Sequence, residues 1–549
     1  MARTDLFRKL RFWLKMAQQE GSGPWAYESE PNLTRRQILS RSAQVLALSS
    51  LPACVTRMAA ASLEPTGEFY DRPLEIAPGL VIVGGGLAGL TAAYELTKAG
   101  INVSVYEASE RFGGRVFTSY SFNDDDMFCE KGAEFVDTNH EELIALAAEL
   151  GVEMQALHSK SKSLADEVYF FGGRMRTEKE LISGFAPLAK ILQKDMKKLM
   201  VKGELQVPTY KQTLGPDAEA LDRISLSEYL ERCRSSVNAW ILDLIRVAYV
   251  GEYGLEADEQ SALNLLILID PETKGGLKIF GESDEAFRIH GGSSQLVQAL
   301  VRKLEGLQVP VYLQHELTAV KQQGSGLKLV FTNDTRTVEV LSATTILALP
   351  LPILRKIEGL LQLDLSPVKK QVISEMGFGS NSKFMVGFKQ RYWQKGVKGS
   401  KGHKGSIFTD QESQAYWDSS RLQEGEAGIL TNFLGGKAGV LIGPGKLSQV
   451  LSDLDKMMPG IQALHDGHKV LQHWPSAPTA LGSYICPKPG QYTSLIGAAE
   501  EPELNETLYF IGEHCSVDYG GYMNGAVSSG KALVKNLLQK VGTKTKEAS

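Results

Sequence analysis

The chain has 549 residues, of which 43% are hydrophobic and 22% are charged, and its formal net charge at pH 7 is −5. This composition is that of a soluble globular protein, and the length allows roughly two to four domain-sized units. A slightly acidic chain has no electrostatic basis for binding nucleic acid, so we expect no nucleic-acid partner.

The first 60 residues resemble an export signal. Arg35 and Arg36 precede a short apolar stretch at 43–53, which has about half of the roughly 20 residues that a membrane span requires. The arginine pair is similar to a twin-arginine (Tat) signal, which exports folded proteins, and it predicts a periplasmic or secreted location. Cys54 ends a segment that loosely resembles a lipoprotein cleavage site. A lipid anchor on Cys54 with membrane association therefore stays open, as does an amphipathic helix in a cytosolic protein.

The cysteines and histidines show no metal-ligand pattern. None of the five cysteines pairs with another at metal-ligand spacing, and the nine histidines form no HxH or HxxxH cluster, so we expect no metal site. A protein that folds before export folds in a reducing compartment. We therefore expect free thiols at the four cysteines that follow the signal, which are Cys129, Cys233, Cys486 and Cys515.

A βαβ unit opens the main body of the chain. Residues 80–83 form a short apolar strand, and a glycine-rich segment follows it. The next stretch is helical to Ala99, with Gly100 as its stop, and residues 102–106 form the second strand.

Later segments change between helical and strand-like patterns. Residues 140–280 look mostly helical, with apolar spacing of three and four in 141–150 and 226–249. Residues 395–410 are rich in Gly and Lys, which is typical of an exposed loop. Strands are expected at 309–313, 327–331, 338–341, 345–348, 384–388 and 508–511, and a C-terminal helix is expected at 525–538.

The glycine-rich segment carries the spacing GxGxxG between a strand and a helix. Gly84 permits a tight turn, Gly86 lets the backbone approach a pyrophosphate, and Gly89 allows close packing of helix on strand. The pyrophosphate would lie at the helix N-terminus, where free N–H groups favour negative charge. Glu107 ends the second strand and could accept hydrogen bonds from the ribose hydroxyls of a dinucleotide.

The segment 107–115, EASERFGGR, resembles the EAxxRxGGR segment of the FAD-dependent amine oxidase superfamily, which includes monoamine oxidases and L-amino acid oxidases. The segments 287–296, FRIHGGSSQL, and 512–513, ten residues before Tyr522, are similar to two further motifs of that superfamily in the same order. The resemblance covers about 78–540. It implies FAD as the cofactor, with contacts from Arg111, Gly113, Gly114, Arg115, Gly512, Glu513 and Met523, and from the backbone of Val320.

The same resemblance implies the fold. We expect an α/β protein in which a discontinuous Rossmann-like FAD-binding domain is combined with an α+β substrate-binding domain of the amine oxidase type. The expected FAD-binding domain consists of 72–138, 284–352 and 472–541. The expected substrate-binding domain consists of 139–283 and 353–471.

Three residues match the active-site pattern of the superfamily. Lys383 resembles the lysine that holds a water near the flavin N5, and Tyr484 and Tyr522 resemble the two tyrosines of the monoamine oxidase aromatic cage. The resemblance implies oxidation of an amine by O2, through loss of a hydride from the carbon next to nitrogen, to give an imine or aldehyde, ammonia and H2O2. Ser483 stands where mammalian-type monoamine oxidases have a cysteine joined to the flavin, so non-covalent FAD is expected.

The substrate class depends on Phe117. The L-amino acid oxidases of this superfamily usually have an arginine at this place, which binds the substrate carboxylate, and here an aromatic residue replaces it. This favours an amine over an amino acid. An L-amino acid oxidase with another anchor, such as Lys274 or Arg288, is the alternative, and a desaturase-type FAD oxidoreductase is a weaker one. The oligomeric state stays open, a homodimer included.

Overall fold

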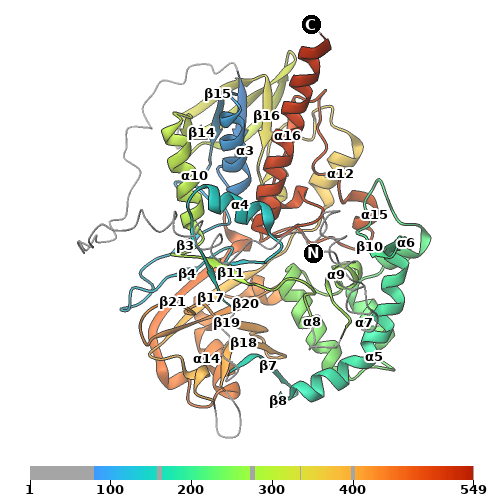
Figure 1. The fold of residues 1–549 in the computed structure, drawn as a ribbon, viewed down its shortest axis with the longest axis vertical. Helices are drawn as coiled ribbons and strands as arrows, with labels where there is room; N and C mark the ends of the chain where they lie inside the picture. Colours follow the sequence, from blue (N-terminus) through green and yellow to red (C-terminus); the bar gives the residue numbers. More distant parts are fainter. Residues whose placement is uncertain (1–78, 158–163, 273–277, 334–335, 397–401, 548–549) are drawn as a thin grey trace, which may run out of the picture. The chain divides into compact units, whose positions relative to one another are not determined.

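The computed structural model describes residues 79–157, 164–272, 278–333, 336–396 and 402–547 (Figure 1). The expected export signal at 1–60, with Cys54, lies outside the described residues. Within the described part of the chain, no helix is both long and apolar enough to cross a membrane.

A five-stranded parallel sheet forms one half of the fold. Its order is β12 (Val311–Tyr312), β2 (Val103–Tyr106), β1 (Leu80–Val83), β16 (Thr344–Leu347) and β22 (Leu508–Phe510). Strands β1 and β2 are short and almost wholly buried, as expected for a parallel sheet that is covered on both faces. Because all five strands run in the same direction, the loops at their carboxyl ends share one edge of the sheet.

Helices cover one face of this sheet and a β-meander packs on the other. Alternate strand residues such as Ile82 and Val105 pack with α3 (Leu87–Lys98), α10 (Ser294–Gly306) and α16 (Met523–Glu547). Figure 1 shows α16 lying along α3. On the opposite face, the ring of Tyr106 stacks on Phe331 of the meander, which consists of β13 (Glu316–Gln323), β14 (Gly326–Asn333) and β15 (Arg336–Ser342).

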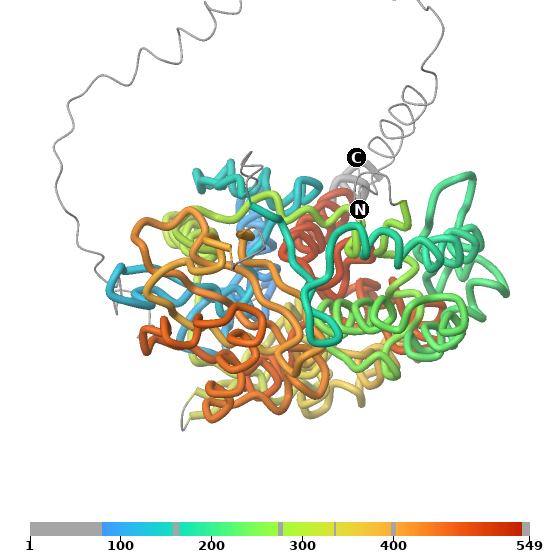
Figure 2. The backbone as a smooth tube through the Cα atoms, turned by 90° about the horizontal axis from the view of Figure 1, so that it is seen from below, coloured from blue at the N-terminus to red at the C-terminus, as the bar shows by residue number. Residues whose placement is uncertain are grey.

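A seven-stranded sheet and a helical layer form the other half. The order of the sheet is β21 (His465–His473), β17 (Ser382–Phe388), β20 (Gly428–Leu434), β19 (Ala415–Asp418), β18 (His403–Thr409), β7 (Ala165–Phe171) and β8 (Arg174–Arg176). Helix α8 (Ala239–Tyr253) packs against β18 and β19. In the view from below, the green helical segments lie beside the orange segments of this half (Figure 2). All seven residues of β17 are buried.

The remaining helices and short strands complete these layers. The helices are α4 (Glu141–Glu149), α5 (Glu178–Met196), α6 (Pro216–Asp222), α7 (Leu226–Cys233), α9 (Leu263–Leu268), α11 (Leu351–Leu354), α12 (Pro367–Glu375), α13 (Gly436–Leu441), α14 (Leu447–Met457) and α15 (Gln491–Leu495). The short strands are β3 (Thr118–Ser119), β4 (Cys129–Glu130), β5 (Phe135–Val136), β6 (Met154–Ala156), β9 (Met200–Val201), β10 (Glu204–Leu205) and β11 (Phe287–Ile289).

The expected α/β class with a parallel sheet is confirmed. The expected strands at 80–83, 102–106 and 508–511 are also confirmed, as β1, β2 and β22. All five parallel strands come from the three segments assigned to the FAD-binding domain, although the domain boundaries themselves stay a prediction. The expected free thiols are also confirmed, because Cys129, Cys233, Cys486 and Cys515 are all unpaired and buried.

Two expectations were wrong. The region 140–280 is not mostly helical between 150 and 177, because β6, β7 and β8 lie there. The segment 226–249, with its helical apolar spacing, does form helices, α7 and α8. The expected loop at 395–410 contains β18, whose alternate residues are buried between β19 and β7. Strands β7 and β18 pair with each other across a long stretch of the chain, which local composition does not show.

Substitution of Gly89 tests the packing of α3 on the parallel sheet. A Cβ added at Gly89 would lie 2.0 Å from the backbone oxygen of Gly84, so something must shift. We expect Gly89→Ala to destabilise the protein by about 1–3 kcal/mol and to lower the midpoint of urea denaturation. The control is Gly306→Ala in α10, where no atom lies within 4 Å of the added Cβ. Equal midpoints for the two variants would contradict this account.

Candidate functional site

The expected cofactor residues gather at the carboxyl edge of the parallel sheet. The N–H of Gly84 donates to Tyr106 O at 2.7 Å, and the N–H of Ala348 donates to Val83 O at 2.8 Å. The N–H of Ile511 donates to Leu347 O at 3.1 Å. The loops that follow β1, β2, β16 and β22 therefore meet at one edge, which is where open α/β sheets bind ligands.

The first glycine turn forms an open cradle at the N-terminus of α3. Gly84 has φ 108°, and a Cβ there would lie 2.5 Å from Ala348 O. Gly89 is tightly packed as described above, whereas nothing lies within 4 Å of a Cβ added at Gly86. Two of the glycines therefore serve packing and the third leaves space beside free helix N–H groups. This arrangement fits the pyrophosphate of a dinucleotide such as FAD.

Glu107 is buried and joins this turn to its own loop. Its Oε2 accepts a hydrogen bond from the Gly85 N–H at 2.7 Å, and its Oε1 accepts from the N–H and the hydroxyl of Ser109 at 2.9 and 2.7 Å. A carboxylate has about four acceptor positions, so one remains for a ribose hydroxyl.

Arg111 supports the second glycine turn, Gly113-Gly114, from inside. Its guanidinium donates to three backbone carbonyls within residues 112–116, including Gly114 O at 2.6 Å. Burial lowers the pKa of this guanidinium. Gly113 and Gly114 both have positive φ, and the Gly113 N–H donates to Gly85 O at 2.8 Å, which joins the two turns.

Arg115 forms an ion pair with Glu513. Its Nη1 donates to Glu513 Oε1 at 2.7 Å and to Ser483 O at 2.6 Å. The other oxygen of Glu513 accepts from the Gly521 N–H at 2.8 Å. The anion that Arg115 contacts in this structure is thus a protein carboxylate, and the expected contact of both residues with FAD stays a prediction. The pair fastens the second turn to the Tyr484 and Tyr522 segments.

Val320, Gly512 and Met523 complete the expected cofactor residues. The Val320 N–H donates to Glu358 O at 2.8 Å, and the expected contact of the Val320 backbone with adenine stays a prediction. Gly512 donates its N–H to Ser529 Oγ at 3.0 Å, and Met523 is buried at the start of α16.

The structure brings Tyr484 and Tyr522 together at the end of α8. The Tyr522 hydroxyl donates to Glu252 Oε1 at 3.0 Å, and the Tyr484 hydroxyl donates to the carbonyl of the preceding residue, Gly251, at 3.4 Å. A Cβ added at Gly521 would lie 3.6 Å from the Tyr484 ring. Consecutive residues of one helix thus hold the hydroxyls of both expected cage residues.

Glu252 is a candidate functional residue that the sequence analysis missed. It is half-buried, and desolvation raises its pKa to about 7. The ring of His140 lies 5.2 Å from that of Tyr522, and burial lowers the His140 pKa to about 4, so this imidazole is neutral at pH 7. An available signal was the acidic residue near the C-terminus of an apolar helix, where the helix dipole disfavours it.

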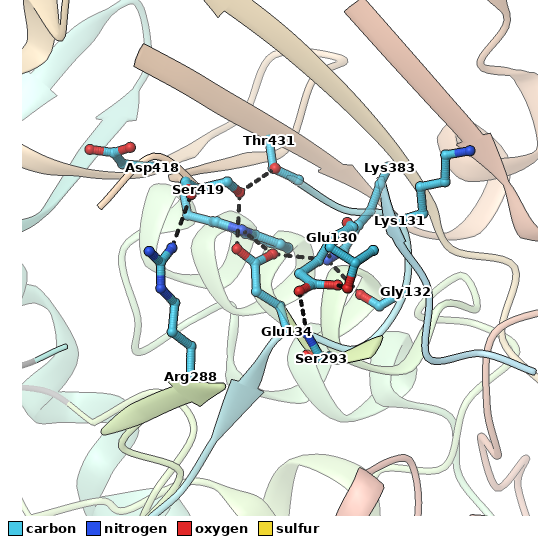
Figure 3. Close-up of polar contacts among 12 residues, drawn as sticks. Glu130, Lys131, Gly132, Glu134, Arg288, Ser293, Lys383, Asp418, Ser419 and Thr431 are labelled. Carbon is cyan, nitrogen blue, oxygen red and sulfur yellow. Dashed lines mark hydrogen bonds and ion pairs between the residues drawn. The ribbon is translucent and has the colours of Figure 1, made fainter. Parts of the chain in front are cut away.

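Lys383 lies on the buried strand β17, between β21 and β20, and is 6% exposed. Its Nζ is 3.1 Å from Glu134 Oε2 (Figure 3), a contact that no local sequence pattern predicts. The neighbouring Asn381 donates to Gly251 O at 2.6 Å and accepts from the Ser483 hydroxyl at 2.7 Å. Lys383 is therefore connected, through the strand that carries it, to the tyrosine pair.

Phe117 lies between two cations. The Arg111 guanidinium is 3.8 Å from the centre of its ring, and the Lys131 ammonium is 4.3 Å from it. Of the alternative carboxylate anchors, Arg288 is buried and donates to Ser419 O at 3.1 Å, and Lys274 lies outside the described residues. Arg288 is thus held by the protein itself.

Comparison with known proteins gives consistent results. A family model described as flavin-containing amine oxidoreductase matches residues 87–538. A flavin-containing amine oxidase from Oncorhynchus mykiss is 24% identical over 481 residues, covering 84% of this chain and 86% of that protein. Polyamine oxidase 4 from Oryza sativa subsp. japonica is 24% identical over 492 residues, covering 86% of this chain and 91% of that protein.

Solved structures share the fold. A triple mutant of putrescine oxidase superposes with a TM-score of 0.68 at 21% identity, covering 84% of this chain and 99% of that one. Cyclohexylamine oxidase from Brevibacterium oxydans superposes with a TM-score of 0.70 at 18% identity, covering 85% of this chain and 99% of that one.

Release of the flavin by denaturation tests the expected non-covalent attachment. Ser483 has no thiol, and its hydroxyl is engaged by Asn381. We expect acid precipitation of the purified protein to leave all FAD in the supernatant, measured by its absorbance and fluorescence. Yellow colour that stays with the precipitated protein would contradict the expectation.

The raised pKa of Glu252 predicts a pH dependence of stability. The unfolded chain loses this proton near pH 4.5 and the folded protein near pH 7, so the folded state binds more protons between these values. The contribution of Glu252 to the free energy of unfolding should therefore fall as pH rises through this window. The free energy of unfolding, measured by urea denaturation at several pH values, should therefore fall less steeply with pH in Glu252→Gln than in the unchanged protein. The control is Glu149→Gln. Because the pKa of Glu149 is lowered instead, this change should not make the fall in stability with pH less steep. An unchanged pH dependence in Glu252→Gln would contradict the raised pKa of Glu252.

Proposed function

Because the chain belongs to the flavin-containing amine oxidoreductase family, we propose that it oxidises a primary or secondary amine and uses O2 as the electron acceptor. The cofactor of the family is FAD. The observation that carries the proposal is the tyrosine pair held at the end of α8, next to the loops that receive the cofactor.

For a primary amine, the reaction is R–CH2–NH2 + O2 + H2O → R–CHO + NH3 + H2O2. When bound, FAD supplies the acceptor for the hydride that leaves the carbon next to nitrogen. The chain supplies the orientation, because Tyr484 and Tyr522 are flat walls that hold the amine. The neutral His140 beside Tyr522 and the raised pKa of Glu252 indicate surroundings that disfavour charge. Such surroundings favour the neutral amine, whose lone pair the reaction needs.

Two observations support an amine over an α-amino acid. An amino acid site needs a cation for the carboxylate. At the position of the expected arginine the chain has Phe117, and Arg288 is buried against Ser419 and the ring of Phe128. The relatives and structural neighbours reported above are also named for amines, including putrescine and cyclohexylamine.

Export is a separate part of the proposal and rests on the sequence. The arginine pair at 35–36 and the apolar stretch after it support export of the folded, FAD-loaded protein by the Tat route, with an optional lipid on Cys54.

A peroxide assay tests the proposed reaction. The purified, FAD-containing protein is incubated with aliphatic, cyclic and aromatic amines, with diamines, and with L-amino acids. We expect H2O2 with at least one amine and none with the amino acids, and Tyr522→Ala should reduce the rate on that amine by at least about tenfold. H2O2 with amino acids alone would make the protein an amino acid oxidase and contradict the proposal. Flavin that no compound reduces would contradict the amine chemistry altogether.

A further inference from the structure

A buried cation next to the second glycine turn has all of its hydrogen bonds satisfied by the protein. The Lys383 ammonium donates to Gly132 O at 2.8 Å, to Glu134 Oε2 at 3.1 Å and to Glu130 O at 3.3 Å. An ammonium has three N–H donors, so these acceptors account for all of them. Its Nζ also lies 4.9 Å from the centre of the Trp417 ring.

Glu134 is as fully engaged as Lys383. Its side chain is 4% exposed. Oε2 also accepts from the Trp417 indole N–H at 2.9 Å, and Oε1 accepts from the Ser419 hydroxyl at 3.0 Å. The Ser419 hydroxyl is in turn 2.6 Å from that of Thr431 (Figure 3). Trp417 and Ser419 therefore hold this carboxylate against the lysine, and Thr431 supports Ser419.

The ion pair is joined directly to the turn that is expected to receive the flavin. The Ala133 N–H donates to Arg115 O at 3.1 Å, and the Lys131 N–H donates to Phe117 O at 2.8 Å. A Cβ added at Gly132 would lie 1.9 Å from Arg115 O, so the two segments are in backbone contact. The segment 130–134 that holds Lys383 is therefore part of the wall behind the second glycine turn.

We propose that Glu134 is a positioning residue that holds the Lys383 ammonium in a pair without net charge and so limits the action of Lys383 on the reaction with O2. This inference rests on the proposed use of O2. In that step O2 would take two electrons and two protons from the reduced flavin and become H2O2. Negative charge develops on oxygen, and a nearby unpaired cation would stabilise it more than a neutral pair does.

The test is Glu134→Gln, which keeps the shape of the side chain and removes its charge. We expect O2 to reoxidise the reduced variant faster by about tenfold, because one negative charge next to Lys383 is removed. A second readout is the midpoint potential of the bound FAD, which should become more positive. Both are measured at a pH well above 7, where the neighbouring Glu130, whose pKa is raised to about 7 by burial, is ionised throughout.

A double-mutant cycle shows whether the effect acts through Lys383. Lys383→Met should slow reoxidation far more than it slows reduction by an amine, and Glu134→Gln should have no further effect on reoxidation in that background. An equal acceleration with and without Lys383 would place the effect on Glu134 itself and overturn the proposal. A Glu134→Gln single variant whose reoxidation rate and midpoint potential are both unchanged would also overturn the proposal.

Two further variants separate charge from structure. Ser419→Ala removes a hydrogen bond to Glu134 without changing charge and should leave the potential unchanged. Glu149→Gln removes the carboxylate of a partly exposed Lys–Glu pair, with Lys98, and should have no effect. If Glu134→Gln does not fold, Glu134→Asp, which draws the carboxylate back from Lys383, should change both readouts in the same direction by less, and no change would overturn the proposal.

The FAD is reduced photochemically for these measurements, without an amine. A failure to find an amine substrate would therefore contradict the proposed function and leave this test intact. Conversely, unchanged reoxidation in Glu134→Gln would contradict the role of Glu134 and leave amine oxidation intact.

Discussion

The ion pair between Arg115 and Glu513 is the contact on which the geometry of the site depends. These residues are 398 positions apart, and Arg115 also reaches the carbonyl of Ser483, 368 positions away. The glycine turn after β2, the segment before Tyr484 and the segment before Tyr522 are therefore held at one place. Because Glu513 is buried and accepts backbone N–H bonds as well, breaking the pair would leave an uncompensated charge inside the protein.

Each cation around the expected cofactor turn has a partner in the protein, either a carboxylate or an aromatic ring. Arg115 has Glu513, Lys383 has Glu134, and the two cations Arg111 and Lys131 share the ring of Phe117. Buried pairs of this kind contribute little net stability, but they fix where each charge lies. The electrostatic surroundings of the flavin therefore depend on which partners are present as much as on the cations themselves.

The tyrosine pair depends on a different constraint, which is the end of α8. Gly251 and Glu252 receive the hydroxyls of Tyr484 and Tyr522, and Asn381, two residues before Lys383, donates to the Gly251 carbonyl. A helix from the middle of the chain thus connects the two tyrosines to strand β17.

The sequence by itself determined the parts that depend on local backbone requirements. The glycines at 84 and 89 predicted a turn that leaves no room for a side chain, and the strand before it and the helix after it were correctly expected. The Gly172-Gly173 pair, which joins β7 to β8, is a hairpin signal of the same local kind, although the sequence analysis did not use it. Contacts between distant residues could be decided only by the tertiary structure. Glu134 lies 249 positions from Lys383 and Glu252 lies 270 positions from Tyr522, and no local pattern specifies which buried carboxylate meets which donor. The hydrogen bond from the Val320 N–H to Glu358, a residue outside the sheet that contains Val320, is a further contact of this kind.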